Sequence, residues 1–334
     1  MKICVFEAEP WEQASFDRLA EDHDVRCTTK PLSADNVADF ADADIVSVFI
    51  YSELDAEVLA ELDEVKMVAT RSTGFDHVDT DICRERGVTV SNVPTYGTNT
   101  VAEHVFALLL ALSHHIVEAV DRTRRGDFSQ QGLRGFDLRD KTLGIVGTGD
   151  IGRCVIEMAG GFRMNTIAFD VQPDPELAAE LGFEYVGFDE LLERSDIISL
   201  HVPLNDKTHH MISGEEFDKM QDGVVLINTA RGKILDSQAL LYALSSGKVA
   251  AAGLDVLPEE PAIREEAQLL RRIFREKHDL EALLADHVLL HMRNVIITPH
   301  SAFNTKEAIG RILDTTVDNI EAFLAGEPIN TVGD

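Results

Sequence analysis

Short apolar runs alternate with longer amphipathic stretches along almost the whole chain. Parallel α/β proteins have this pattern, because each buried strand is followed by a helix that crosses back over the sheet. In the first 97 residues the spacing predicts helices over 11–22 and 56–62. Strands are expected at the apolar runs 2–6, 45–49, 67–70 and 89–91. This part of the chain therefore predicts a small doubly wound domain.

A second and larger α/β series follows a polar stretch at 124–139. Its expected strands are residues 142–146, 166–169, 197–201, 224–228, 251–254 and 295–298. Because this sheet is then complete, we expect the last amphipathic helix, 305–325, to cross back to the first domain. The expected domains are thus 98–300, which is continuous, and 1–97 with 301–334, which is discontinuous.

Residues 98–122 predict one long and very apolar helix. Its apolar side chains recur every three or four positions, as at Val101, Val105 and Leu108. A membrane span needs about 20 nearly uncharged apolar residues, whereas Glu103 and His104 interrupt this run. We expect a buried helix or one that lies at a subunit interface.

The charge excludes several classes of partner. The 334 residues include 59 acidic and 30 basic side chains, for a formal charge of −29. Such a surface repels phosphate backbones and anionic lipids, so nucleic-acid and membrane binding are not expected. With 45% hydrophobic residues the composition is still that of a globular protein. The acidity also fits a surface adapted to high salt, although no motif supports that interpretation.

The cysteines are widely separated and form no C-x-x-C pair; they are Cys4, Cys27, Cys83 and Cys154. This favours reduced thiols over a secreted disulfide framework. The first apolar residues run directly into Glu7 and Glu9, without the apolar region of a signal peptide. A cytoplasmic protein is therefore expected.

Gly147, Gly149 and Gly152 form a G-x-G-x-x-G motif between an expected strand and an expected helix. There the first glycine permits a tight turn, the second lets the backbone approach a pyrophosphate, and the third allows close packing of helix on strand. The N-terminus of the helix would face the diphosphate. The motif predicts a dinucleotide site; the alternative is a glycine turn that binds nothing.

Asp170 ends the next expected strand, eighteen residues after Gly152. In NAD-binding domains a carboxylate at about 20 residues' distance holds the adenosine ribose. Val171, Gln172 and Pro173 follow it, so no basic side chain is at hand for a 2′-phosphate. NAD is therefore expected rather than NADP, with a merely solvated Asp170 as the alternative.

Charged residues also end three later strands. Arg231 follows one, Asp255 and Glu260 follow the next, and His300 follows the last. Ligands bind beyond the carboxyl ends of parallel strands, so these residues should converge at one edge. Singly, Arg231 could pair with a surface acid, Glu260 could be a solvated charge and His300 could start a helix. Jointly, after a dinucleotide motif, they favour an active site.

With these motifs the sequence resembles the D-2-hydroxyacid dehydrogenase family over essentially its whole length. The matching segments are TRSTGFDHVD from Thr70, TVAEH from Thr100, GTGDIG from Gly147, HVPLNDKTHHMI from His201, INTARGKILD from Ile227, D-x4-E-P from Asp255 and TPHSAF from Thr298. The TPHSAFNTKEA ending, the stretch that reaches Tyr96 and the long segment before His300 resemble the D-lactate dehydrogenase branch. The resemblance implies a Rossmann NAD domain, a flavodoxin-like substrate domain and an active site in the cleft between them.

The resemblance also implies three catalytic residues. Arg231 would grip the carboxylate of a 2-oxo acid and polarise its carbonyl, which suits a permanently charged guanidinium. His300 would protonate the carbonyl oxygen as hydride arrives from the nicotinamide, and would act as base in reverse. Glu260 would hydrogen-bond and orient the imidazole of His300. Because positive charge already lies where the alkoxide develops, no metal is expected.

Further site residues carry over by motif. Backbone N–H groups of the Ser72-Thr73-Gly74 loop would bind the substrate carboxylate. The candidate walls of the substrate pocket are Ile50, Tyr51, Tyr96 and Phe303, of which Tyr51 and Phe303 fit a core position equally well. The expected cofactor contacts, besides the three glycines and Asp170, are Asp150, Ile151, Val202, Pro203, Thr208, Thr229, Ala230, Arg231 and Asp255.

Residues 262–293 depart from the shorter family pattern and are helical in period and mixed in charge. They fit either a solvated helical pair at the edge of the active site or a contact with a partner. Because related enzymes are dimers, a homodimer through residues 98–122 is expected, with an internal helix as the alternative.

The expected reaction is the reversible, NAD-dependent reduction of a small 2-oxo acid, pyruvate first, to the D-2-hydroxy acid. The alternatives within the family are a branched or aromatic 2-oxo acid, glyoxylate or hydroxypyruvate. Outside catalysis, the chain resembles NAD-sensing, dehydrogenase-like corepressors, although it shows no disordered tail of the kind they use. The Arg, Glu and His trio argues against another NAD-containing enzyme such as an adenosylhomocysteine hydrolase.

Overall fold

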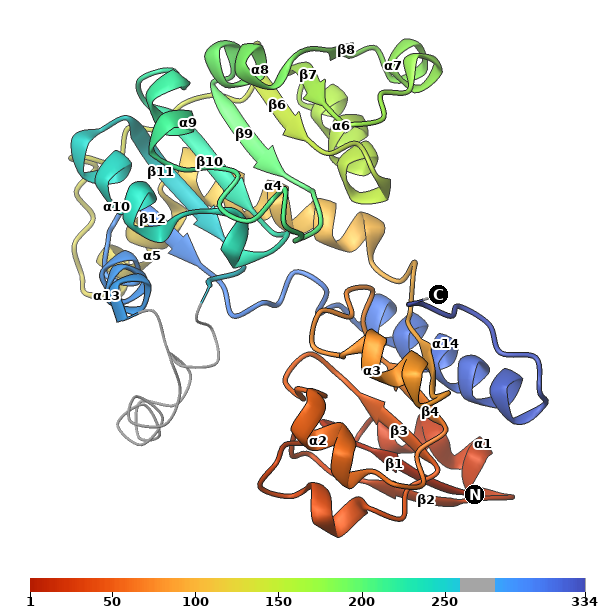
Figure 1. The fold of residues 1–334 in the computed structure, drawn as a ribbon. Coiled ribbons are helices and arrows are strands. Elements are labelled where there is room, and N and C mark those ends of the chain that lie inside the picture. The colour runs from red at the N-terminus through yellow and green to blue at the C-terminus, as the bar shows by residue number, and fades with distance from the viewer. Residues whose placement is uncertain (259–279, 334) are drawn as a thin grey trace. The chain divides into compact units, whose positions relative to one another are not determined.

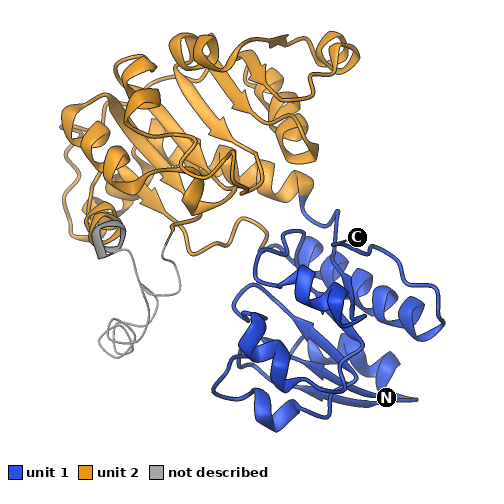
Figure 2. Cartoon of the chain, in the orientation of Figure 1, with its two compact units in different colours: residues 1–97, 304–334 blue, residues 98–303 orange. Residues whose placement is uncertain are grey.

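The computed structural model describes residues 1–258 and 280–333, which form two compact units (Figures 1 and 2). Unit 1 comprises residues 1–97 and 304–334, and unit 2 comprises residues 98–303. Each unit has its own parallel sheet, with five strands in unit 1 and seven in unit 2. The expectation of two α/β parallel-sheet domains is confirmed.

The sheet of unit 1 has the order β2-β1-β3-β4-β5, as in flavodoxin-like folds. Its strands are β1 (Lys2–Val5), β2 (Asp24–Cys27), β3 (Ile45–Val48), β4 (Met67–Thr70) and β5 (Thr89–Ser91). Its helices are α1 (Asp17–Ala20), α2 (Ala56–Glu61), α3 (Thr80–Glu85) and α14 (Lys306–Leu324), with short 3₁₀ turns at Gln13–Phe16 and Val37–Phe40. On one face of the sheet, α14 buries Leu313, Val317 and Ile320.

The sheet of unit 2 has the order β12-β11-β10-β9-β6-β7-β8, which contains the Rossmann arrangement. Its strands are β6 (Thr142–Val146), β7 (Asn165–Phe169), β8 (Glu184–Tyr185), β9 (Ile197–Leu200), β10 (Val224–Asn228), β11 (Val249–Leu254) and β12 (Val295–Ile297). Its helices are α4 (Thr98–Ser113), α5 (Ile116–Arg124), α6 (Asp150–Gly161), α7 (Pro175–Leu181), α8 (Phe188–Arg194), α9 (Gly214–Lys219), α10 (Ser237–Ser246) and α13 (Leu280–Leu289), with a 3₁₀ turn at Gly232–Ile234.

The prediction of one helix over 98–122 is wrong. The chain forms α4 and α5, which meet at a bend of 61° where His115 has φ +51. The chain near residues 135 and 136 packs against this break. There the N–H of Phe136 donates to the carbonyl oxygen of Ser113, the last residue of α4, at 3.0 Å. Gly135 approaches so closely that a Cβ would lie 1.8 Å from that oxygen.

The predicted helix over 11–22 is also wrong, since the chain there forms a 3₁₀ turn and the four-residue α1.

In the described part of the chain, no single helix is long and apolar enough to cross a membrane. The bent pair of α4 and α5 would be long and apolar enough only if the two helices are counted together.

Candidate active site

Two glycines shape the turn after β6 because the packing requires them. Gly147 has φ +97, and a Cβ there would lie 2.7 Å from the carbonyl oxygen of His201. A Cβ on Gly152 would lie 2.1 Å from the carbonyl oxygen of Gly147. A side chain at Gly152 would therefore force the start of α6 away from the turn after β6, and a side chain at Gly147 would force that turn away from the segment after β9.

Gly149 differs from these two glycines, because nothing lies within 4 Å of the position that its Cβ would take. It is the N-cap of the 12-residue α6, with an extended backbone that any residue can adopt. Asp150 and Ile151 begin the first turn of the helix. The open space thus lies against backbone N–H groups at a helix N-terminus, an arrangement that fits the pyrophosphate of a dinucleotide.

Asp170 is fixed beside this turn by three hydrogen bonds. Its Oδ2 accepts from the N–H of Thr148 at 2.7 Å and from the Thr148 hydroxyl at 3.0 Å, and its Oδ1 accepts from the N–H of Gln172 at 2.9 Å. Burial alone would raise the pKa of Asp170, but these hydrogen bonds hold the pKa below its ordinary value. An oriented, ionised carboxylate here fits the hydroxyls of an adenosine ribose.

Thr229 carries a buried hydroxyl at the same edge of the sheet. The residue follows β10, is 9% exposed, and its Oγ1 has no hydrogen-bond partner within the described chain. Because buried hydroxyls are nearly always paired, this atom fits a site that a ligand completes. Val202 and Pro203 follow the neighbouring β9, where the hydroxyl of Thr208 donates to the carbonyl oxygen of Pro203 at 2.5 Å. The residues present therefore fit NAD.

Arg231 lies on a rigid loop after β10. The side-chain amide of Asn228 donates to the carbonyl oxygen of Arg231 at 3.0 Å, and its Oδ1 accepts from the N–H of Ala230 at 3.0 Å. The next residue, Gly232, packs so closely that a Cβ would lie 2.1 Å from the carbonyl carbon of Leu257. The loop thus fixes the backbone of Arg231, which as a whole residue is partly buried.

Asp255 organises the segment that carries His300. The residue is 1% exposed, and its carboxylate accepts hydrogen bonds from the hydroxyl of Thr298 and from the N–H groups of Ser301 at 2.9 Å and Ala302 at 2.8 Å. Its backbone carbonyl accepts from the N–H of His300 at 2.9 Å. His300 is held there with φ +50, a left-handed conformation that residues with a Cβ rarely adopt.

His104 on α4 adds a further contact to these hydrogen bonds of Asp255, which together we call the Asp255 anchor. Its Nε2 lies 3.0 Å from Oγ1 of Thr298 and 3.5 Å from Oδ1 of Asp255. Burial alone would raise the pKa of Asp255, but hydrogen bonds from His104, Thr298 and the two backbone N–H groups hold the pKa below its ordinary value. The sequence motifs assign no role to His104 or Thr298. The feature of the sequence that could have indicated such a role is a histidine within an apolar helical run.

Two expectations concern residues that the structure does not describe. Glu260, the expected partner of the His300 imidazole, lies outside the described residues, and so does the 262–279 part of the 262–293 segment. The remainder of that segment includes α13.

Four of the expected substrate contacts lie on one edge of the sheet of unit 1, at the ends of three strands. Tyr51 follows β3, Thr73 and Gly74 follow β4, and Tyr96 follows β5, which are neighbouring parallel strands. Tyr51 is 40% exposed, which excludes the alternative that it is a core residue. Phe303 is partly buried and belongs to unit 2, so unit 1 alone does not bring it to this edge.

Residues 106–302 match the family model described as the NAD-binding domain of D-isomer-specific 2-hydroxyacid dehydrogenases. The chain is 35% identical to D-lactate dehydrogenase from Escherichia coli, over 98% of each chain. It is 36% identical to an aromatic 2-oxoacid reductase from Clostridium sporogenes, over 97% of this chain and 96% of the relative. Among solved structures, D-lactate dehydrogenase from Aquifex aeolicus, complexed with NAD and lactic acid, superimposes with a TM-score of 0.87 at 36% identity, over 97% of this chain and 96% of that one.

Proposed function

The chain belongs to the D-isomer-specific 2-hydroxyacid dehydrogenase family and is an NAD-dependent oxidoreductase; from that premise we propose that it reduces pyruvate reversibly to D-lactate. The observation that carries the proposal is the Asp255 anchor, which holds His300 in a left-handed turn beside the cofactor edge of unit 2. Similarity to D-lactate dehydrogenases over nearly the full chain supports the choice of substrate.

The proposed reaction assigns separate tasks to the two units. When bound, NADH supplies a hydride to the carbonyl carbon of the substrate. In unit 2, Arg231 binds the substrate carboxylate and polarises the carbonyl, and His300 donates a proton to the carbonyl oxygen. In unit 1, the N–H groups of Thr73 and Gly74 bind the carboxylate. In this scheme Arg231 and His300 of unit 2 neutralise the alkoxide charge as it forms, and the N–H groups of unit 1 help to hold the substrate by its carboxylate.

The proposed contacts with NAD lie at the carboxyl ends of the strands in the sheet of unit 2. We assign the pyrophosphate to the Gly149 end of α6, the adenosine ribose to Asp170, and the nicotinamide side to Thr229 and Ala230. Glu260 is proposed to orient the imidazole of His300, as the family resemblance implies.

Oxidation of NADH, followed by absorbance with pyruvate as substrate, tests the proposal. Turnover that forms D-lactate and not L-lactate is the expected result. Absence of turnover with pyruvate, together with turnover of a different 2-oxo acid, would reject the substrate and keep the reaction.

A second candidate substrate class has one specific observation in its favour. The aromatic 2-oxoacid reductase of Clostridium sporogenes is as similar to this chain as the D-lactate dehydrogenases are. A panel with phenylpyruvate, a branched 2-oxo acid, glyoxylate and hydroxypyruvate separates these possibilities by their kcat/KM. NADH binding without turnover of any of them would instead favour an NAD-sensing protein.

We propose a homodimer in which α5 is covered by a second copy. Its Ile116, Val117 and Val120 are 49%, 56% and 41% exposed, and Phe128 beyond it is 79% exposed. Apolar side chains this exposed are commonly buried in subunit contacts. Sedimentation equilibrium should give twice the chain mass.

A cytoplasmic location is proposed because the four cysteines are free thiols.

A further inference from the structure

The loop Ser72–Gly74 of unit 1 has the features of a small anion site. Within the described chain, the backbone N–H groups of Thr73 and Gly74 donate no hydrogen bond to another residue. The hydroxyl of Ser72, by contrast, donates to the carbonyl oxygen of Gly74 at 2.6 Å, which tightens the turn. Consecutive unpaired N–H groups beyond a strand end form a concave donor site for a carboxylate. Its strength depends on how firmly the loop is held.

The loop is held from the neighbouring strand end by Asn92, which directly follows β5. The side-chain amide of Asn92 donates to the carbonyl oxygen of Thr73 at 2.8 Å. The hydroxyl of Thr73 donates to the carbonyl oxygen of Val93 at 2.8 Å, and the N–H of Val93 donates to the carbonyl oxygen of Ser72 at 3.0 Å. Asn92 is 7% exposed, so water offers little replacement for these bonds.

Asn92 is in turn held by two asparagines from the C-terminal part of the chain. Asn319 on α14 is fully buried, and its amide donates to the carbonyl oxygen of Asn92 at 2.8 Å. The amide of Asn330 donates to Oδ1 of Asn319 at 2.7 Å, and the carbonyl oxygen of Asn330 accepts from the N–H of Asn92 at 3.0 Å. Asn330 has φ +51, a left-handed conformation that asparagine adopts more readily than most residues.

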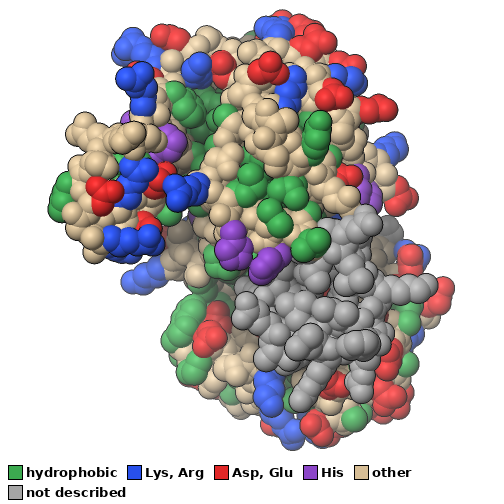
Figure 3. All heavy atoms as spheres, turned by 90° about the vertical axis from the view of Figure 1, so that its left-hand side faces the viewer, with side chains coloured by type: hydrophobic (Ala, Val, Ile, Leu, Met, Phe, Trp, Pro, Cys, Tyr) green, Lys and Arg blue, Asp and Glu red, His purple; other side chains and the backbone are tan. Residues whose placement is uncertain are grey.

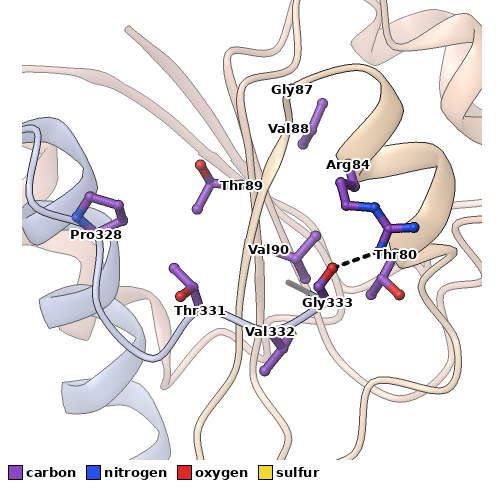
Figure 4. Close-up of a pocket in the computed structure, with 10 residues that line it drawn as sticks. All are labelled: Thr80, Arg84, Gly87, Val88, Thr89, Val90, Pro328, Thr331, Val332 and Gly333. Carbon is purple, nitrogen blue, oxygen red and sulfur yellow. Dashed lines mark hydrogen bonds between the residues drawn. The ribbon is translucent and has the colours of Figure 1, made fainter.

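The segment 329–333 that carries Asn330 lies along the edge strand β5 (Figure 4). The hydroxyl of Ser91 donates to the carbonyl oxygen of Ile329 at 2.9 Å, and the N–H of Val332 donates to the carbonyl oxygen of Val90 at 2.9 Å. Beyond Val332, the guanidinium of Arg84 on α3 donates to the carbonyl oxygen of Gly333 at 3.0 Å (Figure 4). The segment is therefore docked at both ends, with Asn330 between them.

We propose that segment 329–333 is a positioning element for substrate binding, which acts through Asn330, Asn319 and Asn92 to hold the donor loop Ser72–Gly74. This inference rests on the proposed function, because it takes the loop as the carboxylate site. Buried amides that satisfy one another in series fix a single geometry, since any shift leaves a buried polar group unpaired. None of the three asparagines has to touch the substrate for this effect.

The test uses the full-length protein and compares three variants. Asn319→Leu removes both amide bonds at the centre of the chain of contacts. Asn330→Gly removes the outer bond while keeping a residue suited to a positive φ. The matched control is Thr316→Val, because Thr316 is also fully buried on α14 but its hydroxyl donates only to Ile312 of its own helix, at 2.7 Å.

The expected result is a rise in KM for the 2-oxo acid by about tenfold in Asn319→Leu and about threefold in Asn330→Gly, with kcat changed less than about twofold. Binding of NADH, measured by its fluorescence, should be unchanged. Thr316→Val should lower the melting temperature without changing KM. A KM within about twofold of the wild-type value in both asparagine variants would overturn the proposal, and so would a KM that follows the melting temperature in all three.

If Asn319→Leu does not fold, the KM of Asn330→Gly alone tests the proposal. Asn330 is only partly buried, and its replacement alters the same series of hydrogen bonds. Failure of the proposed function would look different, because the wild-type protein itself would then turn over none of the 2-oxo acids.

Discussion

His300 occupies a backbone conformation that a histidine adopts at some cost, with φ +50. The cost is met by Asp255, whose buried carboxylate and carbonyl bind residues on both sides of the turn. The arrangement fixes the backbone of His300 just beyond β12, and this is a reason to assign His300 the proton transfer.

Replacement of His300 tests that assignment. His300→Asn keeps a residue that tolerates a positive φ but removes the titrating imidazole. We expect kcat to fall by about 10²- to 10⁴-fold, with NADH affinity and melting temperature close to wild type. His300→Ala should lose activity equally and also lower the melting temperature. Turnover in His300→Asn above about a tenth of the wild-type value would reject the role of general acid.

The imidazole of His201 is buried in a way that makes stability depend on pH. Burial lowers its pKa to about 4, although the residue as a whole is only partly buried. Because the unfolded chain binds a proton near the ordinary pKa of 6.5 and the folded chain does not, stability is lost as the pH falls from about 6.5 to about 4.

His201→Gln should remove part of this acid sensitivity. Urea unfolding at pH 7 and pH 4.5 should show a smaller loss of stability in the variant than in the wild type, by an amount on the order of 2 kcal/mol. The exposed His209→Gln is the control and should behave like the wild type. Equal losses of stability in all three proteins would show that His201 binds a proton as readily in the folded protein as in the unfolded chain.

Among the elements, the glycine turn and α6 separate what the fold requires from what a ligand requires. Gly147 and Gly152 are needed for packing, whereas Gly149 borders open space. A side chain at Gly149 therefore costs the fold little and occupies the space assigned to the pyrophosphate.

Gly149→Ala should fold with a near-wild-type melting temperature and bind NADH at least about tenfold more weakly. Gly187→Ala is the matched control, because Gly187 is also an extended helix N-cap, that of α8, with nothing within 4 Å of its Cβ position. Calorimetric titration with NADH compares the two variants. An unchanged affinity in Gly149→Ala would place the pyrophosphate elsewhere.

Elements with strong apolar patterns could be predicted from the sequence, and those set by tertiary contacts could not. The buried strands β3 and β9 read as apolar runs, whereas the edge strand β2 alternates between exposed and partly buried residues and gives no such run. The break between α4 and α5 depends on Phe136, whose N–H takes the carbonyl oxygen of Ser113 from another part of the chain.

The candidate site shows the same division. Motif spacing located Arg231 and His300 at strand ends, because the carboxyl ends of parallel strands share an edge. It could not reveal that Asp255 anchors the turn of His300 or that His104 reaches Thr298, since these contacts join α4, β11 and the turn after β12. Nor could it connect Asn330 with Thr73, which are linked only through Asn319 and Asn92.

For the whole molecule, the net charge of −29 is the dominant electrostatic feature. Residues 1–97 contain 21 acidic and 8 basic side chains, so the excess is pronounced in unit 1. Acidic side chains are spread over the face drawn in Figure 3 instead of forming one patch. Their mutual repulsion opposes the folded state at low ionic strength.

Salt should therefore stabilise the protein. We expect the melting temperature to rise by about 4 °C or more between roughly 0.05 and 1 M NaCl, because the screening length falls to a few ångströms. Chloride is the appropriate anion, since sulfate stabilises most proteins through exclusion from their surface. A melting temperature that falls with NaCl would indicate that the ion pairs outweigh the repulsion.

The reduction of a 2-oxo acid at the expense of NADH is the central claim, and steady-state oxidation of NADH by the purified protein tests it most directly. With pyruvate, phenylpyruvate, a branched 2-oxo acid, glyoxylate and hydroxypyruvate as substrates, we expect turnover that is highest with pyruvate and yields the D-2-hydroxy acid. Absence of turnover with all five, in a protein that still binds NADH, would contradict it.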